Sequence, residues 1–69
     1  MKWLEGQTKT FKQAVEEGKQ FYMRKYKYYG MYHNPKIVTA EVALKKSKVL
    51  VPGYYEGERF CPYEFSIIE

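Results

Sequence analysis

The chain has 69 residues, 12 of them basic and 8 acidic, with a net charge of +4. A chain of this length has room for one domain, residues 1–69, and buries only about 60% of the surface that its unfolded form exposes. Because Cys61 is the only cysteine and His33 the only histidine, an intramolecular disulfide and a Cys/His zinc site are excluded, and aromatic side chains must fill the core instead.

The N-terminal part is expected to form a short extended segment and then a helix. Met1–Leu4 fits either an edge strand or a loop that places Trp3 in the core. A helix is predicted to start at Thr8 or Thr10, because a threonine hydroxyl can accept a hydrogen bond from the exposed amides of a first turn. Apolar residues at helical spacing follow from Phe11 onward.

After Gly18, the segment FYMRKYKYYGMY, residues 21–32, allows two interpretations: the helix continues through it, or a strand begins. If the helix continued, its stripe would comprise Phe11, Val15, Gly18, Tyr22, Tyr26 and Tyr29. If a strand begins, Phe21 and Met23 point one way, and the other face holds Tyr22, Arg24, Tyr26 and Tyr28. We favour the strand, because a glycine weakens a helix interior by about 1 kcal/mol relative to alanine and Tyr and Phe suit pleated surfaces.

The middle of the chain predicts a turn and a second helix. Pro35 holds Asn34 out of the α region, so HNPK (33–36) is expected to turn. The next apolar residues alternate as in a strand, but Thr39 is a good helix cap and lysines suit a helix C-terminus. We therefore expect a short helix from about Ala40 to Lys46.

The C-terminal third predicts strands. KVLV, residues 48–51, is interpreted as a buried strand, and Glu56–Gly57 as the turn of a tight hairpin. Residues 63–68 alternate as a final strand. The fold class is therefore α+β, a small antiparallel β-sheet of three to four strands packed against one or two short helices.

Charge is distributed unevenly. Between residues 19 and 48, Glu41 alone opposes eight basic residues, whereas residues 54–69 carry four glutamates against Arg59. This polarity favours an anionic partner for the basic middle, or a homo-oligomer in which the basic middle of one copy meets the acidic C-terminal segment of another.

Catalytic chemistry is not indicated. Cys61 and His33 are isolated residues 28 positions apart, which carry almost no specificity for a thiolate-imidazole pair. Neighbouring glutamates, at 16–17 and around Gly57, are typical of solvated surfaces, and the glycines match no phosphate-binding or dinucleotide-binding motif. We expect no enzyme, no catalytic or metal-ligating residues and no cofactor.

A binding surface is better supported. The core of so short a chain cannot hold every aromatic ring, so some tyrosines must be exposed, and exposed Tyr with Arg is typical of protein-binding hot spots. The expected partner-binding residues are Tyr22, Arg24, Tyr26, Tyr28, Lys25, Lys27, Met31 and Tyr32. The same residues could stack single-stranded bases, at roughly 1–3 kcal/mol per base, while lysines neutralise phosphates.

The composition also resembles that of small accessory proteins of phages and mobile elements, many of which occupy a site on a larger host protein. That resemblance covers composition alone. It implies a basic, tyrosine-rich, non-enzymatic inhibitor or regulator with a larger protein partner, and the alternative is a single-stranded nucleic-acid-binding module. The lone cysteine and the absence of an apolar leader or membrane span lead us to expect a cytoplasmic location and no membrane association.

Overall fold

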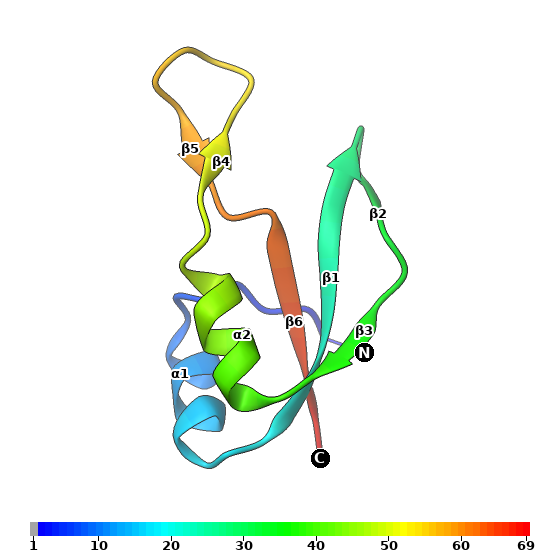
Figure 1. Cartoon of the computed structure of the whole chain (residues 1–69), viewed down its shortest axis with the longest axis vertical. Helices are drawn as coiled ribbons and strands as arrows, with labels where there is room; N and C mark the ends of the chain where they lie inside the picture. Colours follow the sequence, from blue (N-terminus) through cyan, green and yellow to red (C-terminus); the bar gives the residue numbers. More distant parts are fainter. Residues whose placement is uncertain (1) are drawn as a thin grey trace.

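The computed structural model describes residues 2–69, so the expectation for Met1 lies outside the described residues. Within these residues, two helices and six strands follow one another (Figure 1): α1 (Lys9–Glu16), β1 (Gln20–Tyr28), β2 (Met31–Tyr32), β3 (Lys36–Val38), α2 (Ala40–Ser47), β4 (Val51–Pro52), β5 (Arg59–Phe60) and β6 (Tyr63–Ile68). The predicted α+β class is confirmed.

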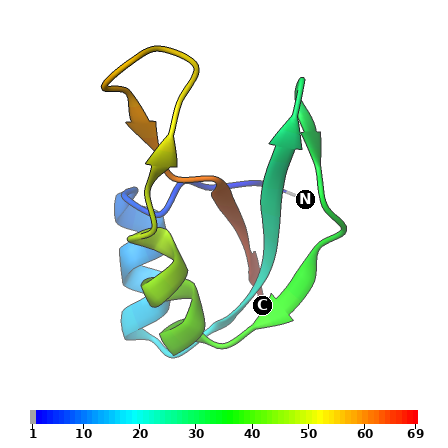
Figure 2. The same ribbon diagram turned by 45° about the horizontal axis from the view of Figure 1, so that its top comes forward.

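β1 is the central strand of a four-stranded antiparallel sheet, which confirms the strand interpretation of residues 20–28. β6 pairs along one side of β1, with Arg24 opposite Glu64 and Lys25 opposite Tyr63. β2 and β3 pair along the other side, and both helices cover the same face of the sheet (Figure 2). β4 and β5 form a separate two-stranded sheet.

The core lies between the two helices and the sheet. Three phenylalanines are fully buried there, one each from α1, β1 and β6: Phe11, Phe21 and Phe65. The Phe11 ring centroid lies 5.1 Å from that of Phe21 and 4.7 Å from that of Phe65. Alanines Ala14 and Ala43 fill the space between the helices and these rings. Because phenylalanine builds this core, the tyrosines are left nearer the surface, as expected.

Local signals set the helix ends. Thr8, one of the two predicted caps, accepts a hydrogen bond from the Phe11 N–H at 3.2 Å, and Thr39 accepts one from the Val42 N–H at 3.3 Å. Gly18 follows α1 with φ +73°, the left-handed conformation that glycine adopts readily. Both helices therefore begin and end within a residue or two of their predicted limits.

One expectation is wrong, and one of the two alternatives left open for residues 1–4 is not observed. KVLV is not a buried strand, because α2 extends to Ser47 with Lys48 as its cap, which leaves Leu50 56% exposed in the connection before β4. Trp3 does not enter the core. Leu4 is buried instead, where its backbone pairs with Phe65, and the alternation of side chains along an extended segment places Trp3 on the opposite face.

Two hairpins project from the same end of the molecule as separate arms (Figure 1). The β1–β2 arm turns at Tyr29–Gly30, where both φ angles are positive, +47° and +74°, as in a type I′ turn. The β4–β5 arm turns as predicted at Glu56–Gly57, where Gly57 has φ +81° and the Glu58 N–H donates to the Tyr55 carbonyl at 3.0 Å. Its connection spans residues 53–58 and is therefore longer than a tight hairpin.

Candidate binding groove between two hairpins

An open groove of about 1030 Å³ lies between the two arms. One wall is supplied by the β1–β2 arm, through Tyr26, Tyr28, Tyr29 and Tyr32. The other comes from the β4–β5 arm and the segment before it, through Leu50, Pro52, Tyr54 and Phe60. The floor is residues 61–64, which connect β5 to β6. Aromatic rings thus face the groove from both sides.

Tyr26 joins the two walls at the base of the groove. Its ring meets Tyr32 at 5.6 Å and Phe60 at 6.0 Å, at interplanar angles of 79° and 83°. These are edge-to-face contacts, which aromatic pairs prefer. Its hydroxyl accepts a hydrogen bond of 3.4 Å from the Gly30 N–H. Tyr26 therefore helps to set the position of one arm relative to the other.

Each arm ends in a pair of exposed tyrosines, which we call the tyrosine tips. Tyr28 and Tyr29 are 50% and 93% exposed, and Tyr54 and Tyr55 are 92% and 70% exposed. Within each pair the rings meet edge to face, at 5.7 Å and 5.1 Å. The tips place four large amphipathic side chains in solvent at one end of the molecule.

Tyr29 occupies its turn position at an energetic cost. A left-handed conformation costs a residue with a side chain about 1–2 kcal/mol, and the exposed ring gains little packing in return. Asparagine tolerates this conformation better, so Tyr29→Asn is expected to raise the free energy of unfolding by about 0.5–1 kcal/mol in urea denaturation. The control Gly30→Ala should lower it by about 1 kcal/mol. A destabilised Tyr29→Asn variant would mean that the ring supports the fold.

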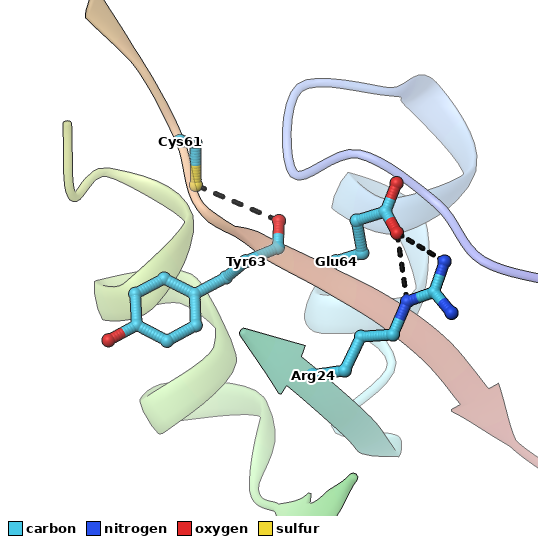
Figure 3. A network of polar contacts seen from close by, with 4 residues as sticks. All are labelled: Arg24, Cys61, Tyr63 and Glu64. Atoms are coloured by element: carbon cyan, nitrogen blue, oxygen red, sulfur yellow. Dashed lines mark hydrogen bonds and ion pairs between the residues drawn. The ribbon is translucent and has the colours of Figure 1, made fainter. Parts of the chain in front are cut away.

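Arg24 is held inside a cluster of aromatic and acidic side chains. Its Nε and Nη2 donate to the same Glu64 oxygen, Oε1, at 2.9 Å and 2.6 Å (Figure 3). Its guanidinium carbon lies 4.3 Å from the centroid of the Trp3 ring and 3.8 Å from that of Tyr32. The Arg24 and Glu64 side chains are 25% and 27% exposed. We call these four residues the Arg24 cluster.

The structure therefore brings only some of the expected binding residues together at the groove. Tyr26, Tyr28 and Tyr32 line the groove, and Met31, which pairs with Tyr28, is exposed beside it. Arg24 is neutralised by Glu64 and stacked between rings, so it is not a free cation.

The remaining three expected residues do not line the groove themselves. Tyr22 is half-buried on the sheet, away from the groove. Lys25 is on the face of β1 opposite to Tyr26, and its Nζ lies 6.0 Å from the centroid of the Tyr63 ring. Lys27 is at a bulge between β1 and β2, and its Nζ lies 5.6 Å from the centroid of the Tyr28 ring. The sequence did not lead us to predict the wall formed by the β4–β5 arm, although the adjacent Tyr54 and Tyr55 near a turn glycine could have indicated a second exposed aromatic site.

Charged groups at the groove are mainly acidic. Glu5, Glu58 and Glu64 line it against Arg59. Glu64 pairs with Arg24, and within residues 2–69 the other ion pair is Glu41 with Lys45, so Glu5 and Glu58 have no cationic partner among the described residues. The groove thus differs in sign from the chain as a whole, whose net charge is +4.

Comparison with protein-family models, curated proteins and solved structures finds no match. Within residues 2–69, no three His, Cys, Asp or Glu side chains gather as a metal site would require. The Cys61 thiol points to two backbone carbonyls, of Lys46 at 3.6 Å and Tyr63 at 3.8 Å. In the same part of the chain, neither helix has the length and apolar character needed to cross a membrane.

Tyr32 in the Arg24 cluster provides a pH test. Burial raises the pKa of Tyr32 above its ordinary value of 10.0, and the Glu64 carboxylate raises it further, while Arg24 lowers it. The folded chain therefore holds this proton more tightly than the unfolded chain, so its contribution to stability is complete below about pH 10 and is lost as the pH rises through the raised pKa. Tyr32→Phe is expected to show a smaller fall in the free energy of unfolding between about pH 9 and about pH 11. Equal falls in both proteins would contradict this.

Proposed function

We propose that this chain is a small non-enzymatic protein-binding module, an inhibitor or regulator that occupies a site on a larger protein partner. The observation that carries the proposal is the pair of tyrosine tips, four exposed rings on two separate hairpins at one end of the molecule. Tyrosine is enriched in interface hot spots, because it gives a large contact area with few side-chain torsions to immobilise.

The backbone at Tyr29 supports the same proposal. Non-glycine residues in left-handed conformations are often found at functional sites, where the strain is tolerated for a reason other than stability. Tyr29 combines such a conformation with a side chain that is 93% exposed. Contact with a partner explains why a tyrosine occupies this position.

A capture experiment tests the proposal. The tagged chain is incubated with lysate of its native cells, with and without nuclease, and recovered proteins are identified by mass spectrometry. We expect one larger protein to remain bound after nuclease. In titrations with that purified protein, Tyr29→Ala/Tyr54→Ala is expected to weaken the affinity by at least about 30-fold, since hot-spot residues contribute 2 kcal/mol or more.

Ile37→Ala is the matched control, because Ile37 is a large apolar residue, 60% exposed, on β3 and outside the groove. Its affinity should equal that of the unaltered chain. Recovery of no protein after nuclease, or equal losses in the tip and control variants, would contradict the proposal.

Single-stranded nucleic acid is the second candidate, favoured by the Lys27 ammonium group 5.6 Å from the exposed Tyr28 ring. A base stacked on Tyr28 would place its phosphate near this cation. The carboxylates of Glu5 and Glu58, which form no ion pair within residues 2–69, weigh against it in the groove. Titration with mixed-sequence oligonucleotides at two salt concentrations distinguishes the two: binding that falls steeply with salt and weakens in Tyr28→Ala supports nucleic acid.

A further inference from the structure

We propose that the groove binds an arginine side chain carried by an extended segment of the partner protein. The inference rests on the proposed function and specifies what the partner presents. The chain's own Arg24 is held by aromatic and acidic groups. In the Arg24 cluster the guanidinium lies against two aromatic rings, 4.3 Å and 3.8 Å from their centroids, and both of its hydrogen bonds go to a carboxylate.

The adjoining groove presents aromatic rings and carboxylates of the same kind, and Arg59, which also lines it, forms no ion pair within residues 2–69. Tyr32 belongs both to the Arg24 cluster, where its ring lies against the Arg24 guanidinium, and to the lining of the groove. Tyr26 contacts Tyr32 and extends the aromatic surface to Phe60. The carboxylates of Glu5 and Glu58 line this space, and within residues 2–69 neither forms an ion pair. A guanidinium placed there would stack on a ring and donate to a carboxylate.

Charge complementarity selects a cation over an anion. Among residues 2–69, three carboxylates and the Arg59 guanidinium line the groove, and Arg24 neutralises one of the three carboxylates, that of Glu64. A basic occupant therefore complements the lining of the groove better than a phosphate or an acidic peptide does. The occupant is therefore basic, although the chain itself has a net charge of +4.

The geometry favours arginine over lysine. A guanidinium is planar, is weakly hydrated and stacks on aromatic faces while its edge donates to carboxylates, whereas an ammonium group is compact and strongly hydrated. Tyr26 meets both Tyr32 and Phe60 nearly at right angles, so the walls offer ring faces in two orientations. The volume of about 1030 Å³ exceeds a single side chain and accommodates the residues on either side of it.

The probe is an acetylated tetra-arginine amide, with the tetra-lysine amide as its comparison, titrated into the ¹⁵N-labelled full chain at constant ionic strength. We expect chemical-shift changes centred on Tyr28, Tyr54 and residues 60–64, and binding about two- to fivefold tighter for arginine than for lysine, in line with cation–π contributions at accessible sites. The arginine peptide is also expected to displace the captured partner.

The variant Glu5→Gln/Glu58→Gln is expected to weaken arginine binding about tenfold, since it removes charge-assisted hydrogen bonds. Glu16→Gln/Glu17→Gln makes the same change of net charge on exposed positions in and after α1, away from the groove, and should leave the affinity unchanged. Equal affinities for both peptides, or equal losses in both variants, would overturn the inference and indicate non-specific attraction to acidic residues.

The other outcomes separate the inference from the proposed function. Capture of a partner that the arginine peptide does not displace would overturn the inference and leave the protein-binding function standing. Groove shifts that grow with protein concentration in the absence of peptide would show that the occupant is the basic segment of a second copy, which would also overturn it. Absence of any captured partner would instead contradict the proposed function.

Discussion

Replacement of Phe11 by alanine is expected to leave much of the chain unfolded in the absence of denaturant. Phe11 is fully buried, and its ring is in contact distance of both other core phenylalanines, at 5.1 Å and 4.7 Å. Truncation of such a side chain costs about 3–5 kcal/mol, because it removes apolar burial and leaves a cavity. A chain of this length has a total stability of about 3–10 kcal/mol, so the loss is comparable with the whole.

Urea denaturation followed by circular dichroism measures the effect. Phe60→Ala is the matched control, because it removes the same ring from a half-buried position on the β4–β5 arm, outside the core cluster. It is expected to cost about 1 kcal/mol, in proportion to the smaller buried area. A Phe11→Ala variant as stable as Phe60→Ala would mean that the three buried phenylalanines do not form the core.

Replacement of Arg24 by methionine is expected to lower the free energy of unfolding by about 2 kcal/mol. The substitution keeps much of the apolar volume but leaves the Glu64 carboxylate, 27% exposed, without both of its hydrogen-bond donors. It also removes the cation from between the rings of Trp3 and Tyr32.

A double-mutant cycle isolates the Arg24–Glu64 pair. Because Glu64→Gln removes the charge that Arg24 compensates, the double variant is expected to lose less than the sum of the two single variants, by about 1 kcal/mol. Lys45→Met is the control, since its pair with Glu41 spans 3.9 Å and both side chains are more than three-quarters exposed. That change should alter stability by less than about 0.5 kcal/mol. Additivity at Arg24 and Glu64 would show that the short contacts contribute nothing net.

The parts of the fold that the sequence predicts correctly are those with local causes. Thr8 and Thr39 cap helices through bonds to residues three positions away, and Gly18 ends α1 through its own φ angle. The strand predicted at residues 48–51 is wrong for a non-local reason, because a strand needs a partner from elsewhere in the chain. Val49 and Leu50 are as apolar as strand residues, but the helix before them ends one residue later than predicted, and no partner strand reaches them.

The candidate site was predictable only on one wall. The alternation along β1 identifies Tyr26 and Tyr28 as a pair on one surface, but the opposite wall joins them only through the tertiary structure. The role of Arg24 could not be inferred either, because its partner Glu64 lies 40 residues away in sequence. An exposed arginine and an internally neutralised one look the same in a sequence.

The separation of the two arms into different sheets has a thermodynamic consequence. β4 and β5 are two residues each, and a hairpin of that size is marginally stable alone, so the β4–β5 arm depends on the Tyr26–Phe60 contact to hold its position. Its amide hydrogens should therefore exchange with solvent much faster than those of β1 and β6. A ligand that spans the groove would fasten this arm to the main sheet, so binding should slow exchange at residues 51–60 and carry an entropic cost from the lost motion.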